Sequence, residues 1–177
     1  MKMNKSNCEK AEMLVEVLPY VNRFRDKIIV IKYGGNAMIN EDLKKAVMQD
    51  LLLMKSVGMH PILVHGGGPA INDMLKKLKV ESHFEQGLRV TDKETMEIVE
   101  MVLAGKVNKD IVGTLNQIGG KGIGLSGKDG NLIQARKKYL EKNGEKIDIG
   151  YVGEVEAVNK EMLESLIYSG YIPVISS

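Results

Sequence analysis

Cysteine is nearly missing from this chain of 177 residues, which holds only Cys8. One thiol cannot form an internal disulfide framework or a cluster of cysteine metal ligands, and such scarcity is typical of a reducing compartment. An excess of one charge is also missing, because 25 basic residues face 23 acidic ones for a net charge of +2. With no basic stripe and no interleaved aromatic residues, nucleic acid is not expected as the main partner.

Long apolar runs are absent as well. No stretch approaches the roughly 20 apolar residues of a membrane span, and the opening "MKMNKSNCEK" lacks the apolar core of a signal peptide. We therefore expect a cytoplasmic protein without a membrane segment. Hydrophobic residues make up 44% and charged residues 27% of the chain, which is ordinary for a soluble globular protein with one sizeable core, or with one domain and the start of another.

The N-terminal segment has a helical pattern after a polar lead-in over residues 1–8. Between residues 9 and 25 apolar side chains recur at helical spacing, and Pro19 within this pattern predicts a kinked or broken helix. The recurring residues are Met13, Leu14, Val17, Leu18, Val21 and Phe24. Two interpretations stay open: a helix that lies on its own domain, or an exchangeable arm that meets another subunit.

The rest of the chain alternates strands with helices. We expect strands at 27–33 and 61–65, helices at 40–57, 69–78 and 92–118, and a closing helix at 159–169 followed by a strand in "YIPVISS". Further strands are expected within 122–138 and 152–158, with 138–146 as a hairpin loop. The apolar face of the helix at 40–57 is expected to hold Leu43, Val47, Leu51 and Met54. This order predicts an α/β domain with a largely parallel central sheet, and we expect the chain to be incomplete at its C-terminal strand.

Glycine clusters follow two of the predicted strands, in "VIKYGGNAM" at 30–38 and "ILVHGGGPAIND" at 62–73. Glycines between a strand and a helix let backbone N–H groups converge on an anion. If the strands are neighbours in a parallel sheet, both loops open at its carboxyl edge, where ligands bind. Neither loop has the spacing of a P-loop or of a dinucleotide-binding fingerprint. The clusters therefore indicate a phosphate or carboxylate ligand.

Three charged or titratable residues each allow two interpretations. Lys32 faces an anion if it is buried, or reaches water from the end of its strand. Arg89, in "EQGLRVT", holds a carboxylate or caps a neighbouring element. His65 is a general base or a packed core histidine, and we favour the core histidine. The spacing of His60, His65 and His83 is not that of a metal site.

The lack of an evident base is compatible with one kind of reaction. A carboxylate with a pKa of about 4.3 is already ionised at pH 7, so its phosphorylation requires no proton abstraction. Such a transfer requires lysines and oriented N–H groups to offset charge repulsion. Two glycine loops and a lysine fit this requirement.

Taken together, these motifs resemble the N-terminal part of the acetylglutamate kinases, within the amino-acid kinase family. The matching stretches are "VIKYGGNAM", "LVHGGGPAI", "GLRVTD", "GLSGKDGNLI", "VGEVEAVN" and "YIPVISS", in the family's order across residues 27–177. The resemblance implies a three-layer αβα sandwich and ATP-dependent phosphorylation of the γ-carboxylate of N-acetyl-L-glutamate, a step of arginine biosynthesis. It divides the chain into an N-terminal arm at 1–26 and an acetylglutamate-binding and dimerisation domain at 27–177.

The resemblance also implies residue roles. Lys32 would stabilise the transferring phosphoryl group, with backbone N–H groups of Gly35 and Gly67 along its path. Gly34 and Gly35 would contact ATP, which brings Mg²⁺ as a cosubstrate complex. The acetylglutamate site would be formed by Gly67, Gly68 and Arg89, with Arg89 on the α-carboxylate. Asp129 and Glu154 match family motifs but receive no role.

The family pattern extends beyond residue 177, where a second catalytic lysine and most of the ATP site are expected. The resemblance thus implies that the C-terminal nucleotide-binding half is absent from this chain, and we expect negligible kinase activity from it alone. "LPYVNRF" resembles the extra helix of arginine-inhibited members, which implies a homodimer or a homohexamer with L-arginine as feedback inhibitor. Two alternatives remain: a stand-alone acetylglutamate-binding module without catalysis, and a kinase of another small carboxylate.

Overall fold

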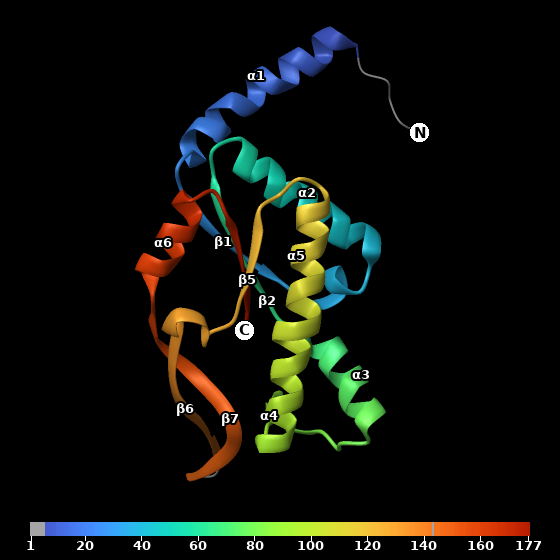
Figure 1. The fold of residues 1–177 in the computed structure, drawn as a ribbon, viewed down its shortest axis with the longest axis vertical. Coiled ribbons are helices and arrows are strands. Elements are labelled where there is room, and N and C mark those ends of the chain that lie inside the picture. The colour runs from blue at the N-terminus through green and yellow to red at the C-terminus, as the bar shows by residue number, and fades with distance from the viewer. Residues whose placement is uncertain (1–5, 143) are drawn as a thin grey trace.

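A four-stranded parallel sheet forms the centre of the computed structural model, which describes residues 6–142 and 144–177 (Figure 1). Its strand order is β1 (Ile28–Tyr33), β2 (His60–His65), β8 (Ile172–Ser176) and β5 (Gly122–Leu125). Each neighbouring pair is parallel. The predicted α/β class with a parallel sheet is confirmed.

Helices cover both faces of this sheet, as Figure 1 shows. Successive residues of a strand point to opposite faces, so Leu63 packs toward α2 (Glu41–Ser56) and α5 (Asn108–Gln117), whereas Ile62 packs toward α6 (Lys160–Tyr168). Two apolar cores result, one on each side, which confirms the predicted three-layer αβα sandwich. The larger core holds Tyr33, Met48, Leu51, Leu63, Ile111, Leu115, Ile172 and Val174.

The long helix predicted at 92–118 is present, and it contains a π-helical segment that the sequence did not predict. α4 (Lys93–Glu100) begins after Asp92, whose side chain accepts a hydrogen bond from the Thr95 N–H. The π-helical segment Met101–Val107 then leads directly into α5. A third apolar cluster packs α4 and this segment against α3 (Gly68–Leu78). One continuous helix thus serves two different cores.

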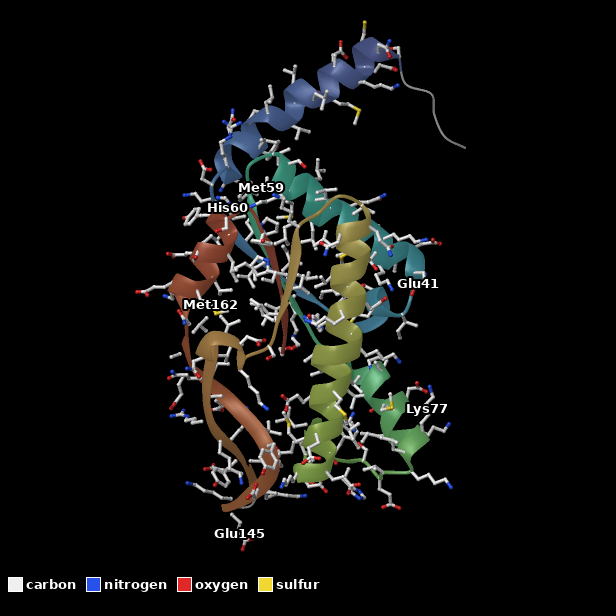
Figure 2. The ribbon with its side chains drawn as sticks, viewed as in Figure 1. Glu41, Met59, His60, Lys77, Glu145 and Met162 are labelled. Carbon is white, nitrogen blue, oxygen red and sulfur yellow. The ribbon has the colours of Figure 1, made fainter. Side chains whose placement is uncertain are left out.

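Two hairpins complete the fold: β3 (His83–Glu85) with β4 (Leu88–Val90), and β6 (Ile133–Lys142) with β7 (Glu145–Val158). The predicted loop at 138–146 is wrong, because the strands continue to Lys142 and resume at Glu145. Leu140 and Ile149 are buried and give these polar strands an inner side. Figure 2 places Glu145 at the far tip of the hairpin. Short 3₁₀ turns occur at Gly35–Met38 and Asp129–Asn131.

α1 (Asn7–Phe24) extends away from the sheet and buries none of its residues (Figure 1). A reciprocal capping box between Ser6 and Glu9 begins this helix. It continues through Pro19 without a break, so of the two predicted outcomes, a kink or a break, the break is wrong. Pro19 removes the hydrogen bond to the Val15 carbonyl, but both residues are exposed and water can satisfy that oxygen. Across the described residues, no helix combines the length and apolar character that crossing a membrane would require.

The other predicted helices are present, with one correction in α2. Leu43 was expected on its inner face but is 48% exposed. Leu51 is buried as predicted, and Lys44 and Met48, which were not in the predicted set, are buried as well. The Lys44 ammonium is neutralised by Glu41 at 3.1 Å and by Asp110 of α5 at 2.8 Å. Lys44, paired with these two carboxylates, therefore lies on the inner face of α2, where the apolar periodicity had predicted Leu43.

Candidate functional site

The two glycine loops lie side by side at the carboxyl edge of the sheet. β1 and β2 are neighbours, with Tyr33 opposite His65, and the Gly66 N–H donates to the Tyr33 carbonyl at 3.3 Å. On the other side of β2, the Ser177 N–H donates to the His65 carbonyl at 3.0 Å. The expectation that both loops open at one edge is confirmed.

The first loop exposes backbone next to a lysine. Gly34 and Gly35 are exposed, and Gly35 has a φ of +63°, which favours glycine. The Tyr33 hydroxyl donates to the Ala37 carbonyl at 2.8 Å and ties the loop down. Lys32 is exposed at the end of β1, and no salt-bridge partner for it occurs among the described residues. Of the two interpretations of Lys32, the side chain that reaches water agrees with its exposure. Its role in stabilising the phosphoryl group stays a prediction.

The second loop brings backbone close to the π-helical segment. Gly67 is buried, and a Cβ atom there would lie 2.5 Å from Leu103 Cδ2. Its carbonyl accepts the Ile71 N–H and begins α3, with Pro69 in the first turn. No side chain caps this end of α3. The first N–H groups of a helix have no partner within it, so this loop presents donors and the positive end of the helix dipole to an anion.

His65 lies beneath this loop, fully buried in a hydrogen-bond network. Its Nδ1 is 2.9 Å from the Gly66 carbonyl, and its Nε2 is 3.1 Å from Asn108 Nδ2. Asn108, also buried, donates from the same nitrogen to the Val174 carbonyl at 2.9 Å. Burial lowers the pKa of His65, which keeps the ring neutral. The preferred interpretation of a packed core histidine is confirmed.

No sequence pattern identified Asn108 as a functional residue. It lies on the buried face of α5 together with Ile111 and Leu115. An asparagine at an apolar position of a helix is a usable signal, because a buried amide requires partners. Here its carbonyl oxygen is approached by the Lys109 ammonium at 3.3 Å. The polar network thus joins α5 to β2 and β8 below the glycine loops.

Arg89, on β4, lies beside the first turns of α3. Its guanidinium donates to Ser82 Oγ and Asn72 Oδ1 and stacks 4.6 Å from the Phe84 ring centroid. Burial lowers its pKa. Asn72 follows Gly68 by four residues, or about 6 Å along the helix axis. All the partners described for Arg89 are neutral, so its charge remains available to an anion, and its carboxylate-binding role stays a prediction.

Two hollows adjoin this edge. One of about 410 Å³ includes Tyr33, Lys44, Gly67 and Asp110 in its lining. The other, of about 370 Å³, opens where β5 and β8 end; Ser126, Lys128, Ser177 and Glu100 contribute to its wall. The Lys128 ammonium is 2.6 and 2.7 Å from the two Glu100 carboxylate oxygens. The sequence did not predict this second hollow, because β5 and β8 are short apolar strands followed by serines, a pattern that indicates no particular ligand.

The two motif residues without an assigned role have structural contacts. Asp129 accepts hydrogen bonds from the Ser126 N–H at 2.6 Å and the Ser126 hydroxyl at 2.9 Å. It thereby closes the turn after β5. Glu154 pairs with Arg136 at 3.2 Å and Lys138 at 3.3 Å, across the β6–β7 hairpin. The described part of the chain contains no group of three or more metal-ligating His, Cys, Asp or Glu residues.

The buried neutral histidine predicts a pH dependence of stability. The pKa of His65 is lowered in the folded chain, whereas in the unfolded chain it is about 6.5. Below that pH the unfolded chain binds a proton that the native chain does not, so the free energy of unfolding falls as pH falls. We expect a loss of up to about 1.4 kcal/mol per pH unit between pH 6.5 and 5.5.

Urea denaturation at pH 5.5, 6.5 and 7.5 measures this loss. The matched control is His65→Asn, which removes the titrating ring and should show a smaller decrease over the same range. Equal pH dependence in both proteins would contradict the assignment to His65. Restricting the range to pH 5.5 and above limits the contribution of carboxylates, whose ordinary pKa values are about 4.

Comparison with known proteins places this geometry in a family. The model of the amino acid kinase family matches residues 27–177. The acetylglutamate kinase of Caldicellulosiruptor bescii is 61% identical over 168 residues, which cover 95% of this chain and 57% of the relative. The acetylglutamate kinase of Moorella thermoacetica is 57% identical, with 98% and 60% covered. The chain therefore spans somewhat more than half the length of these curated relatives.

Solved structures share the fold. The protein smu.665 from Streptococcus mutans UA159 superposes with a TM-score of 0.71 at 32% identity, over 85% of this chain and 58% of that one. The N-acetylglutamate synthase of Neisseria gonorrhoeae, solved with coenzyme A and N-acetyl-glutamate, gives a TM-score of 0.76 at 21% identity, over 97% of this chain and 38% of that one. From the match over residues 27–177 and the parallel sheet with its paired glycine loops, this chain belongs to the amino acid kinase family.

Proposed function

We propose that this chain is the acceptor-binding part of an N-acetyl-L-glutamate kinase, which phosphorylates the γ-carboxylate of N-acetyl-L-glutamate with ATP in arginine biosynthesis. The observation that carries the proposal is the identity of about 60% to acetylglutamate kinases across almost the whole chain. The adjoining glycine loops at the carboxyl edge support it, because a phosphoryl transfer between anions requires converging N–H donors.

In this reaction a γ-carboxylate oxygen forms a bond to the γ-phosphorus of ATP while the bond from that phosphorus to the β-phosphate oxygen breaks, releasing ADP. No proton has to move, because the carboxylate is ionised at neutral pH. The exposed Lys32 ammonium and the N–H groups of Gly35 and Gly67 stabilise charge on the transferring group. Gly34 and Gly35 contact the nucleotide, and Gly67, Gly68 and Arg89 hold the acceptor.

Magnesium enters this proposal with ATP. The described residues supply no carboxylate or histidine cluster of their own, and Mg²⁺ is commonly held largely by substrate phosphates and water. When bound, it offsets charge on the nucleotide phosphates. The chain's own share is therefore backbone N–H groups and Lys32.

Assembly through α1 is part of the same proposal, with residues 1–26 as an arm that meets another subunit. The helix exposes many apolar side chains and buries none, so a second copy would cover them. The exposed set is Met13, Leu14, Val15, Val17, Leu18, Tyr20 and Phe24. We propose a cytoplasmic homodimer, or a homohexamer formed through these helices and inhibited by L-arginine.

Isothermal titration calorimetry of N-acetyl-L-glutamate into the chain tests the acceptor site. We expect specific binding that Arg89→Ala weakens at least about 10-fold, since a hydrogen bond to a charged group contributes about 1.5–3 kcal/mol. Arg89→Lys keeps the positive charge but loses the bidentate geometry of the guanidinium. Its affinity for N-acetyl-L-glutamate should lie between those of the unmutated chain and Arg89→Ala. L-glutamate, which lacks the acetyl group, is the ligand control.

Each outcome has a distinct meaning. Equal affinity for L-glutamate would contradict the acetylated acceptor and favour another small carboxylate. Unchanged binding by Arg89→Ala would remove that residue from the site. A folded chain that does not bind N-acetyl-L-glutamate at all would contradict the assignment of the acceptor site to residues 27–177.

A further inference from the structure

The hydrogen bonds around His65 fix which of its nitrogens carries the proton. The Gly66 carbonyl can only accept, so the His65 Nδ1 at 2.9 Å must be the donor. The Val174 carbonyl can likewise only accept, so the Asn108 group that faces it is the NH₂. The same NH₂ lies 3.1 Å from His65 Nε2, which must therefore accept. The ring is held as the neutral Nδ1–H tautomer.

This tautomer determines how the next peptide group is turned. The peptide between Gly66 and Gly67 is trans, because the described chain contains no cis peptide bond. In a trans peptide the C=O and N–H bonds point in opposite directions. Since the Gly66 carbonyl is directed at the ring, the Gly67 N–H is directed away from it.

The opposite direction leads toward the other face of the sheet. His65 shares its strand face with Leu63, which packs under α5, and its partner Asn108 is on α5. Lys32 pairs in register with Val64, whose side chain packs on the α6 side. The Gly67 N–H is thus directed away from the α5 side, toward the face of the sheet on which Lys32 lies in register, and no backbone acceptor for it occurs among the described residues.

We propose that His65 is a positioning residue, locked as the Nδ1–H tautomer by Asn108, that turns the Gly66–Gly67 peptide so that the Gly67 N–H donates to the bound anion. This deepens the proposed function and rests on it for the identity of the anion. Glycine has few steric limits, so without the His65 ring the Gly66–Gly67 peptide could rotate, and the Gly67 N–H would no longer be directed at the anion. His65 acts through Gly67 and does not touch the acceptor itself.

NMR spectroscopy of the ¹⁵N-labelled chain provides the first test. The imidazole ¹⁵N shifts should identify a neutral His65 protonated at Nδ1. Titration with inorganic phosphate, and separately with N-acetyl-L-glutamate, should shift the Gly67 amide resonance. An Nε2–H tautomer, or a Gly67 amide that neither anion shifts, would overturn the inference.

Two variants separate positioning from a general structural role. His65→Leu removes the donor and should weaken the anion-dependent Gly67 shift at least about 10-fold in midpoint. His65→Asn restores a short N–H donor and should recover much of the response. If a folded His65→Leu chain keeps the response of the unmutated chain, the inference fails. The tautomer measurement uses the unmutated chain, so the inference can fail even where His65→Leu does not fold.

The two proposals can fail separately. If phosphate shifts the Gly67 amide in a His65-dependent way but N-acetyl-L-glutamate does not bind, the orienting role stands and the proposed acceptor is wrong. If calorimetry shows acetylglutamate binding while the Gly67 amide does not respond, the acceptor stands and the orienting role is wrong.

Discussion

Gly150→Ala is expected to lower the free energy of unfolding by about 3 kcal/mol or more, the largest single-site effect that we predict. Gly150 has a φ of +77°, and a Cβ atom there would lie 2.0 Å from the Thr91 carbonyl oxygen. That oxygen accepts the Tyr151 N–H at 2.7 Å in the bridge that joins β7 to Thr91, two residues before the start of α4. Because the obstacle is backbone, no side-chain rotation relieves it.

Gly144→Ala is the matched control. Gly144 has a similar φ of +82°, but a Cβ atom there would meet nothing within 4 Å. The control should therefore show only the cost of placing alanine at positive φ, about 1 kcal/mol. Urea or thermal unfolding measures both variants, and similar losses in the two would contradict the steric contribution of Thr91.

Asn108→Ala should produce the second large loss, again about 3 kcal/mol. The substitution leaves the Val174 carbonyl and His65 Nε2 without their donor, and each buried unsatisfied group costs about 1–3 kcal/mol. A water molecule could replace the amide only by occupying the space that the substitution vacates, between α5, β2 and β8. The variant should also loosen the His65 ring.

Asn116→Ala, on the same helix, serves as its control. Asn116 is exposed and its side chain accepts one hydrogen bond, from the Gly122 N–H at 2.7 Å. Water can take over that bond, so we expect a loss of about 1 kcal/mol or less. Denaturant unfolding measures the free energy of unfolding of both variants. A smaller loss for Asn108→Ala than for Asn116→Ala would contradict the stabilising role of the buried network.

The sequence predicted the order of most elements because their signals were local, but it did not predict the short β3–β4 hairpin. Asp92 could be identified as a helix cap, and the apolar runs at 61–65 and 171–177 could be identified as buried strands, without knowledge of their partners. The meeting of the glycine loops followed from one topological rule for parallel sheets. These features required no side-chain detail.

Other features depended on contacts between distant residues. Lys44 is buried only because Asp110, 66 positions away, neutralises it, so periodicity assigned the inner face of α2 to Leu43. Asn108 acquired its importance from His65 and Val174, neither of which is near it in sequence. The strand residues at 138–142 and 145–146 are polar because the hairpin buries only one narrow side, and their pattern resembled a loop.

The placement of Arg89 illustrates an intermediate case. Only the family resemblance implied that Arg89 shares a site with Gly67 and Gly68. The structure places its guanidinium against Asn72 and Ser82. What the sequence could not indicate is the stacking on Phe84, which orients the planar group. Its proposed contact with a substrate carboxylate remains to be tested by the calorimetric experiment.

The π-helical segment Met101–Val107 has a consequence for how this chain tolerates changes in length. Deleting one residue from an α-helix rotates everything after it by about 100°. Here α4 packs against α3, whereas α5 packs against the sheet. The wider π-helical turns between α4 and α5 set the angle between these two packing faces. A one-residue deletion in this segment would turn Asn108 and Ile111 out of the core. Relatives that conserve both packing faces should therefore keep the number of residues between them constant, even where the residues themselves differ.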